Sequence, residues 1–398
     1  MMHRAMLPLL CLSAPLCAQT THLVGPGGLP QIRDALAIAA PGDVIRVAAG
    51  TYAHFTADVG VTIRALVPNT VSVRFDPAFL PPNCSVDLNC LFHSGPTRFM
   101  PPSGQAVHVV GLTFEPTATT ITGLDLRHRV FVESGTVTFD DCTIQAQDRP
   151  VLSVWSAQLH LQRCNLVGTG SNPTATALFT TDADVIAVDS VFRGSNLLGL
   201  VFSGHGATIR TSTLKASGCQ FLGGTPLFGG LGGHALTTDA QSRIWISDST
   251  LTGGGGQCAI AGVPAVGHIA RSTLVQTAAG CAALLAAPVV GVERPTPIQN
   301  GASFDVLVHT EPNTLVAIHA SPRLAHVEIP GLFAQPIALD LTSFFLAGLF
   351  VSDGNGDVTA SWNMPAGQFV DETIWLEASA WLPGQPVLVG PVVGGVIR

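Results

Sequence analysis

The segment Val137-Thr138-Phe139-Asp140-Asp141-Cys142-Thr143-Ile144 carries the pattern from which the architecture of this chain follows. The pattern is apolar-x-apolar-x-turn-small-x-apolar, and the sequence contains seven copies of it. They occupy residues 107–114, 137–144, 159–166, 185–192, 214–221, 244–251 and 267–274. Their starting positions show that the intervals between copies are unequal. A constant strand pattern separated by loops of variable length indicates an irregular solenoid.

The alternation within each copy indicates how its residues lie. Positions one and three are apolar and alternate with polar positions, which is the period of a strand and not of a helix. Gly, Asp or Arg at position five marks a corner, after which positions six and eight turn inward again. Stacked coils then bury one apolar column at position eight, with equivalent residues ~4.8 Å apart. That column consists of Ile144, Leu166, Phe192, Phe221, Leu251 and Leu274.

We therefore predict an all-β chain whose central part, roughly residues 40–285, is a right-handed parallel β-helix. The intervals between copies are too long for the coils of a hexapeptide β-helix. The coils also lack the helical segment of a leucine-rich repeat, and they hardly supply the several strands that each propeller blade needs.

The segment 28–52, GLPQIRDALAIAAPGDVIRVAAGTY, leads to the same fold. It resembles the opening of pectin-lyase-like β-helix proteins, in which a short amphipathic helix precedes a first strand of the form "pGD.I.v..GtY". Ile32, Leu36 and Ala39 share one helical face. Such a helix would cap the open apolar end of the solenoid and hide its edge. The resemblance implies the fold but no single reaction, because the superfamily includes lyases, hydrolases, epimerases, phage tail spikes and adhesins.

The N-terminal residues predict export. His3 and Arg4 precede an apolar run over 5–14 and small residues at Cys17 and Ala18, which is the order of a secretory signal peptide cleaved after Ala18. We divide the chain into a signal peptide (1–18), the β-helix with its cap (19–288) and a C-terminal module (289–398). A secreted or cell-surface location follows, and no apolar stretch is long enough for a membrane span.

Charge excludes nucleic acid as a partner. The chain has a single lysine, Lys215, and its acidic side chains outnumber its basic ones by 26 to 18. Binding to phosphate backbones needs clustered Lys and Arg, which this sequence lacks.

The C-terminal module is predicted to be a β-sandwich. Strand-like runs occupy 304–308, 315–319, 338–350, 358–362, 374–381 and 387–396. The module loosely resembles C-terminal modules of exported bacterial repeat proteins, which implies surface attachment or sorting. Asp353-Gly354-Asn355-Gly356-Asp357 is interpreted as a hairpin turn. A calcium loop is the alternative, but Met364 would stand where such a loop needs a bidentate carboxylate. No cofactor or metal is therefore predicted.

Seven of the nine cysteines lie after the signal peptide. Cys84 and Cys90 lie close together in one loop and are candidates for a disulfide in an oxidising compartment. The interval from Cys258 to Cys281 equals that from Leu251 to Leu274, so these two cysteines would stack within disulfide range. The copies also place Cys142, Cys164 and Cys219 at position six, where they would serve as small core residues. Nothing suggests zinc, because no CxxC accompanies them.

The corner residues at position five are the main candidates for chemistry. Asp141, Arg163 and Asp189 come from three successive coils, and Asp248 and Arg271 form a second pair. Stacked on the outer surface they would form Asp-Arg-Asp and Asp-Arg ladders. By resemblance, acids and an arginine in such positions handle the carboxylates or glycosidic oxygens of polysaccharides. The alternative, which we prefer, is that alternating charge avoids repulsion between stacked neighbours.

Gly204-His205-Gly206 adds His205 as a weaker candidate. It resembles the Gly-His-Gly segment of polygalacturonase-like glycosidases, which stands beside paired aspartates. Asp140-Asp141 is such a pair, but it lies several coils earlier, and the other signatures of that family are absent. A turn histidine is the simpler interpretation.

Two functions of different classes follow. In the first, the chain is a noncatalytic scaffold for adhesion or for contact with extracellular polysaccharide or the cell envelope. In the second, it is a polysaccharide lyase or glycoside hydrolase whose site lies near Asp141, Arg163, Asp189 and His205. We favour the scaffold, because no complete catalytic signature is present.

Overall fold

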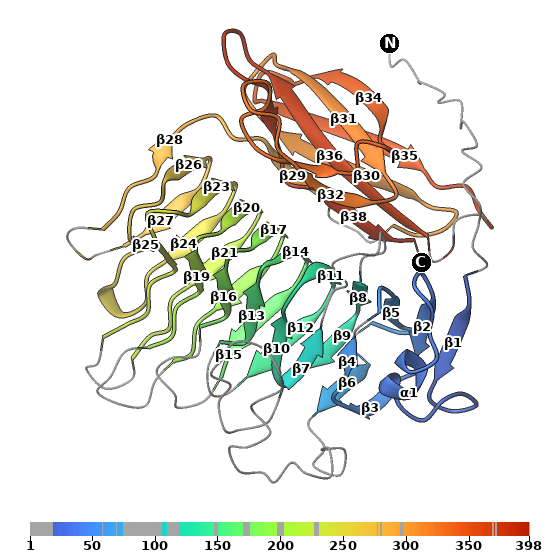
Figure 1. Ribbon diagram of the computed structural model, residues 1–398. Coiled ribbons are helices and arrows are strands. Elements are labelled where there is room, and N and C mark those ends of the chain that lie inside the picture. The colour runs from blue at the N-terminus through green and yellow to red at the C-terminus, as the bar shows by residue number, and fades with distance from the viewer. Residues whose placement is uncertain are drawn as a thin grey trace.

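Three long parallel sheets wind around one axis in a computed structural model of this chain (Figure 1). The structure describes residues 19–397 except 58, 69, 75–105, 110–118, 147–149, 170–175, 197–202, 227–230, 277, 279, 280, 295–297, 368, 369 and 371. The predicted signal peptide and the predicted Cys84–Cys90 disulfide lie outside the described residues.

Successive coils add strands to the three sheets in the order A, B, C. Sheet A consists of β1 (Thr21–Val24), β2 (Val44–Val47), β5 (Thr62–Ala65), β8 (Thr119–Thr122), β11 (Gly135–Asp140), β14 (Ala157–Gln162), β17 (Asp184–Val188), β20 (Thr213–Ser217), β23 (Arg243–Ser247), β26 (Val266–Ala270) and β28 (Leu285–Ala286). Sheet B consists of β3 (Gly50–Ala53), β6 (Val71–Arg74), β9 (Leu124–Leu126), β12 (Thr143–Ala146), β15 (Asn165–Gly168), β18 (Val191–Arg193), β21 (Gln220–Leu222), β24 (Thr250–Thr252) and β27 (Thr273–Val275). Sheet C consists of β4 (Thr56–Ala57), β7 (Ala106–Val109), β10 (Arg129–Val132), β13 (Leu152–Trp155), β16 (Leu178–Thr181), β19 (Ala207–Arg210), β22 (Leu236–Thr238) and β25 (Ile260–Ala261). The predicted β-helix is confirmed.

The register of the repeat is confirmed for six of its seven copies. The first residues of those copies pair in one row of sheet A, from Val137 to Gly267. Their position-eight residues pair in one row of sheet B, from Ile144 to Leu274. This column is buried as far as Leu251, and the rings of Phe192 and Phe221 stack within it at a centroid distance of 4.7 Å.

The predicted position of the remaining copy, residues 107–114, is wrong. Val107 lies in β7 of sheet C and pairs with Val130, and the strand of sheet A that precedes β11 is β8. Thr119 of β8 stands at position one of that coil, opposite Val137. It is buried and its hydroxyl donates a hydrogen bond to the carbonyl of Val59 at 3.3 Å. Because the inward residue at position one is a threonine, this coil does not match a pattern that requires an apolar residue there.

The predicted capping helix is α1 (Ile32–Leu36), which packs on β1, β2 and β4. Ile32, Ala35 and Leu36 are buried against the first coil, and Ala39 lies at the margin of the same core. β1 adds a strand of sheet A ahead of this helix, which was not predicted. Further along, a short 3-10 turn, η3 (Gly254–Gly256), follows β24.

The C-terminal residues form the predicted β-sandwich. One sheet contains β29 (Gly291–Glu293), β30 (Ser303–His309) and β35 (Asp357–Asn363). The other contains β34 (Phe345–Val351), β31 (Leu315–Ser321), β36 (Thr373–Trp381), β37 (Leu388–Val389) and β38 (Val393–Val396). A small third sheet pairs β32 (Leu324–Val327) with β33 (Ile337–Leu339).

Two details of the sandwich differ from the prediction. The run 338–350 is not one strand, because a turn held by Asp340 separates β33 from β34. The segment 353–357 forms the predicted tight turn, closed by backbone bonds from Asp353 N–H to the Asp357 carbonyl and from Gly356 N–H to the Asp353 carbonyl. The strands on either side do not pair with each other, because β34 pairs with β31 and β35 pairs with β30. The Asp353 carboxylate accepts the backbone N–H groups of Asn355 and Asp357 at 2.8 and 3.0 Å. These two bonds hold the Asp353 carboxylate within the turn.

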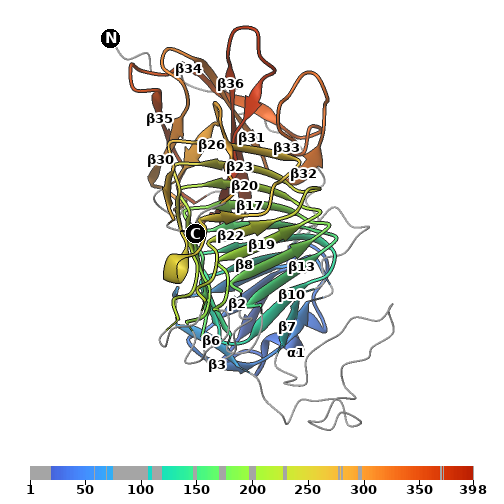
Figure 2. The same ribbon diagram turned by 90° about the vertical axis from the view of Figure 1, so that its left-hand side faces the viewer.

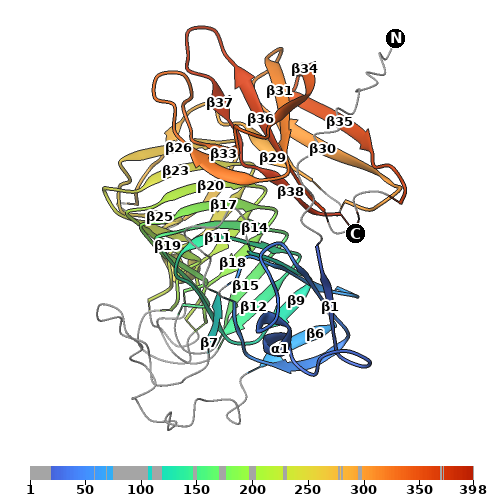
Figure 3. The ribbon, with the colours of Figure 1, turned by 45° about the vertical axis from the view of Figure 1, so that its right-hand side comes forward.

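The sandwich lies along the solenoid, over the outer face of sheet A (Figures 1 and 2). The two parts are joined between β28 and β29, yet β38 contacts coils far from that junction. Gly394 of β38 donates its N–H to the Gln162 side chain of β14 at 3.0 Å. Figure 3 shows the C-terminus near the N-terminal coils. The sandwich therefore covers most of the length of sheet A.

Candidate functional site

The corner residues adopt the bend that was predicted for them. Asp141, Arg163, Asp189, Asp248 and Arg271 all have positive φ, between 44° and 57°. A left-handed conformation turns the chain sharply from sheet A into sheet B in a single residue. Outside glycine it costs roughly 1–2 kcal/mol per residue, and Asp tolerates it better than Arg. The corner is therefore a structural requirement of the coil, whatever else its side chain does.

The second corner ladder forms as predicted. The Arg271 guanidinium donates two hydrogen bonds to the Asp248 carboxylate, at 2.7 and 3.0 Å. The same guanidinium also donates to the carbonyls of Val289 and His309, at 3.0 and 3.1 Å. His309 belongs to β30, so this ladder links the solenoid to the sandwich.

The first ladder includes a residue that was not predicted in it. Arg163 forms an ion pair with Asp140, the last residue of β11, which precedes the corner residue Asp141. Both side chains of this pair are largely buried. The predicted placement on the outer surface is wrong for Arg163, because the sandwich covers this part of sheet A. Gly395 of β38 approaches closely, since a Cβ on it would stand 3.3 Å from an Asp140 oxygen.

The Asp189 side chain lies over the next corner, which is occupied by Gly218. A Cβ on Gly218 would lie 2.3 Å from an Asp189 oxygen. Burial raises the pKa of Asp189 to about 6, and the nearby Glu293 carboxylate adds to this rise. The Arg294 N–H and the charges of Arg163 and Arg294 act on this pKa in the opposite direction.

His205 lies apart from these residues. It precedes β19 in a loop that leads into sheet C, whereas Asp141, Arg163 and Asp189 stand at the corner between sheets A and B. Its Nδ1 accepts the backbone N–H of His234 at 2.9 Å, and the two imidazole rings stack at 5.2 Å. Burial, helped by His234, lowers the pKa of His205 to about 4. The structure therefore does not bring the four predicted site residues together.

Sequence reasoning missed the surface between sheet A and the sandwich, which we call the seam. Its solenoid side consists of the outward residues of five strands, all buried: Thr138, Asp140, His160, Gln162, Ile186, Val188, Lys215, Ser217, Trp245 and Ser247. Ile186 and Val188 belong to the apolar core of the sandwich. Apolar and aromatic residues at outward positions were the signal in the sequence that another layer covers this sheet.

Lys215 and Glu377 form the central ion pair of the seam. The Lys215 Nζ lies 3.7 Å from a Glu377 oxygen and donates a hydrogen bond to the carbonyl of Pro336. Glu377 on β36 also accepts the N–H of Ala338, at 3.0 and 3.1 Å. Burial lowers the pKa of Lys215 and raises that of Glu377, while the attraction between the two opposes both shifts. Each group depends on the other for its charge.

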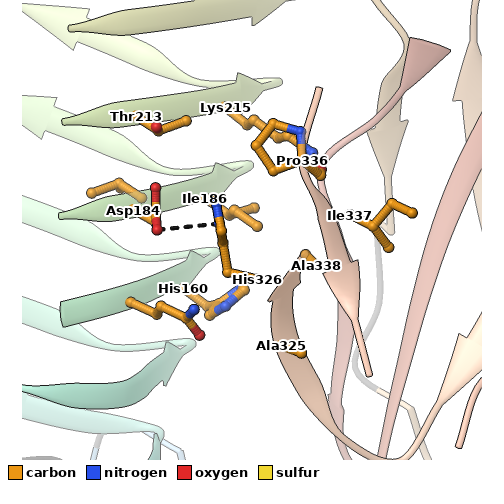
Figure 4. Close-up of a pocket in the computed structure, with 12 residues that line it drawn as sticks. His160, Asp184, Ile186, Thr213, Lys215, Ala325, His326, Pro336, Ile337 and Ala338 are labelled. Atoms are coloured by element: carbon orange, nitrogen blue, oxygen red, sulfur yellow. Dashed lines mark hydrogen bonds and ion pairs between the residues drawn. The ribbon is translucent and has the colours of Figure 1, made fainter. Parts of the chain in front are cut away.

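A small pocket lies at the edge of the seam, between sheet A and the β32–β33 pair (Figure 4). The Nδ1 of His326 lies 3.1 Å from an Asp184 oxygen across it, and Lys215 and His160 reach it from β20 and β14. Burial lowers the pKa of His160 to about 3, so this ring is neutral near pH 7. The space suits roughly a water molecule, which needs polar partners of this kind. A polysaccharide chain does not fit.

The described residues offer no site for a metal, since they contain no suitable group of three or more His, Cys, Asp or Glu side chains. Cys142, Cys164 and Cys219 are buried thiols, and Cys258 and Cys281 form a disulfide with a Cα–Cα distance of 5.3 Å. The part of the chain that the structure describes also contains no helix with the length and hydrophobicity of a transmembrane span.

The outer face of sheet C carries a group of aromatic and cationic side chains, which we call the aromatic row: Arg129, Phe131, Trp155, Phe179 and Arg210. The rings of Phe131 and Trp155 stack at 5.4 Å with planes 11° apart. Arg129 lies 4.7 Å from the centre of the Phe131 ring, and Arg210 lies 5.4 Å from that of Phe179.

The aromatic row differs from the seam in its exposure. Trp155 and Phe179 are half-buried and Arg210 is exposed, whereas Arg129 and Phe131 are buried. Hydroxyl groups accompany the row on neighbouring coils, where Thr237 donates a hydrogen bond to Thr208 at 2.8 Å. Figure 2 shows the strands of sheet C running beneath the sandwich, which covers a different sheet. The eight-residue sequence pattern does not include these residues, because it describes only the strands of sheets A and B.

His309 in the sandwich gives a pH dependence that can be tested. Its imidazole lies 2.8 Å from Asp357 and 3.5 Å from Glu293. The bond with Glu293 is the main cause that raises the pKa of His309 to about 9. A raised pKa means that protonated His309 stabilises the fold. This contribution is complete below pH 6.5 and is lost as pH rises through about 9.

We therefore expect the melting temperature to fall between pH 6.5 and pH 9 by more in the native chain than in His309→Gln. Thermal unfolding of both proteins at several pH values measures the difference. Parallel profiles for the two proteins would contradict this role of His309.

The fold and the surfaces described above define the class of this protein: a parallel β-helix with a β-sandwich docked along one sheet. Comparison with known proteins gives no particular family, since no family model, no curated protein and no solved structure matches the chain.

Proposed function

We propose that this chain is a secreted or cell-surface protein without catalytic activity, whose β-helix is a rigid surface for contact with extracellular polysaccharide. The observation that carries the proposal is the aromatic row of sheet C. The C–H face of a sugar ring is apolar and packs on an aromatic face, while the sugar hydroxyls need hydrogen-bond partners. Trp155 and Phe179 offer such faces, and Arg210 offers donors beside them.

The geometry of the predicted site residues supports a scaffold over an enzyme. A glycosidase or lyase needs its acid and base within reach of one bond of the substrate. Asp141, Arg163 and Asp189 stand at one corner of the coil and His205 in another loop. Arg163 is also held by Asp140 under the sandwich. The polysaccharide lyase or glycoside hydrolase alternative therefore has less support.

Membership of the pectin-lyase-like superfamily and export from the cell belong to the same proposal. The capping helix α1, followed at once by the first coil, supports the superfamily. The charged start, apolar run and small residues of the segment 1–18 support export. A disulfide between Cys258 and Cys281 suits an oxidising compartment.

Binding to immobilised pectin, alginate and chondroitin sulfate tests the function. We expect retention of the chain on at least one polymer, without release of products. Trp155→Ala and Phe179→Ala should each weaken that retention by about tenfold or more, as is usual for aromatic anchors. Val263→Ala, which changes an exposed side chain of the solenoid outside the row, should leave it unchanged.

Two results would overturn the proposal. One is binding to none of a broad panel of polysaccharides. The other is release of products that disappears in Arg163→Ala, which would establish the enzyme instead.

A further inference from the structure

The sandwich carries an exposed apolar surface along β34. Leu346, Leu349 and Val351 of this strand are 52%, 58% and 64% exposed. The same face continues with Leu315 of β31 and Trp381 of β36, which are 42% and 39% exposed and lie in one cross-strand row with Val351. We call these five residues the apolar patch. Contiguous apolar surface of this kind on a folded domain marks an interaction site.

β34 is also an edge strand. Among the described residues it pairs only with β31, so one side of its backbone carries unpaired N–H and C=O groups. Its sequence, FLAGLFV, includes no charge and no proline, which are the usual means of blocking an edge. The register with β31 shifts beside Gly348, but the strand continues to Val351. An uncharged strand edge next to an apolar face suits a partner that offers both an unpaired strand and an apolar surface.

The patch continues an interface that the fold already uses. On the same sheet face, Glu377 and Leu346 both pair with His319, and Glu377 is buried against the solenoid. The solenoid thus covers one part of this face and leaves the β34 side uncovered. Nothing in the patch favours a charged partner, because none of its five residues is ionisable.

The size of the surface matches what a dimer needs. Phe344, which is 42% exposed and whose ring lies 5.6 Å from that of His319, adjoins the patch. Six large side chains that are about half exposed present roughly 500 Å² per copy, which is close to the ~500 Å² per partner at which specific interfaces begin. A two-fold axis lets the same patch serve both copies and closes the assembly at two. We propose that two copies of this chain associate through the apolar patch, with β34 of one beside β34 of the other.

Sedimentation equilibrium of the full chain between about 1 and 100 μM tests the dimer, and hydrogen exchange locates it. We expect a dimer in which the amides of β34 exchange slowly. Leu349→Lys should raise the dissociation constant by about tenfold or more and speed exchange in β34. Val351→Lys is a second variant with the same expected result, should Leu349→Lys fold poorly. Both side chains face solvent in the single chain, so the melting temperature of the separated copies should change little.

Val263→Lys is the matched control, because Val263 is a still more exposed valine on the solenoid and should leave the dimer intact. The proposal is overturned if the native chain is monomeric at 100 μM, or if the dimer survives both patch variants. Uptake onto phosphatidylcholine vesicles by a monomer would also overturn it and assign the patch to a lipid surface. None of these results depends on polysaccharide binding, so the two proposals fail separately.

Discussion

Replacing Lys215 with methionine is expected to destabilise the chain by about 3–5 kcal/mol, the usual cost of removing one partner of a buried ion pair. Methionine keeps most of the volume but leaves the Glu377 carboxylate buried without its cation. Thermal or urea unfolding measures the loss. It should be smaller at acid pH, because protonation of Glu377 removes the unpaired charge.

Two further variants separate this effect from a general loss of packing. Lys215→Met combined with Glu377→Leu should recover much of the stability, since well-packed apolar pairs replace buried ion pairs at little cost. Arg243→Met removes the partner of Glu328 in an ion pair whose two side chains are 34% and 46% exposed, and it should cost about 1 kcal/mol or less. Equal losses for Lys215→Met and Arg243→Met would contradict the importance of the buried pair.

Replacing Phe221 with alanine is the second change with a large expected effect, also about 3–5 kcal/mol. Phe221 is fully buried inside the solenoid and stacks on Phe192 of the preceding coil. Coils above and below hold the walls of the resulting cavity apart, so the core cannot collapse to fill it.

Urea unfolding followed by circular dichroism measures this loss. Phe221→Leu is the graded control, because leucine already occupies the equivalent position in the next coil as Leu251 and should cost less than half as much. A loss of under about 1 kcal/mol for Phe221→Ala would show that the column is not tightly packed.

The fold could be predicted from the sequence because the coil has a strict inside-outside alternation. Positions one and eight of six copies pair as the pattern requires, from Val137 to Leu274. The copy at 107–114 failed for a physical reason. All three sheets share the same alternation, so the pattern of Val107 in sheet C cannot be told from that of sheet A. Only the pairing of neighbouring coils distinguishes them.

The surfaces could be predicted only in part. The bend at Asp141, Arg163 and Asp189 follows from local backbone chemistry, and it is confirmed. Whether those side chains face solvent depends on where the sandwich docks, which no local pattern contains. Lys215 is an example, because its partner Glu377 belongs to the sandwich and lies far along the chain.

The position of β38 has a consequence for the order of events during synthesis. Arg294 donates to the Gly394 carbonyl at 2.6 Å, and Gly394 in turn bonds Gln162 of β14, far earlier in the chain. Ribosomes make the coils of the solenoid first, so the outer side chains of β14 stay in water until β38 has been made. During that interval a chaperone can bind these uncovered side chains. A chain that terminates before residue 393 would lack β38 and would leave the part of sheet A around Gln162 exposed to proteases.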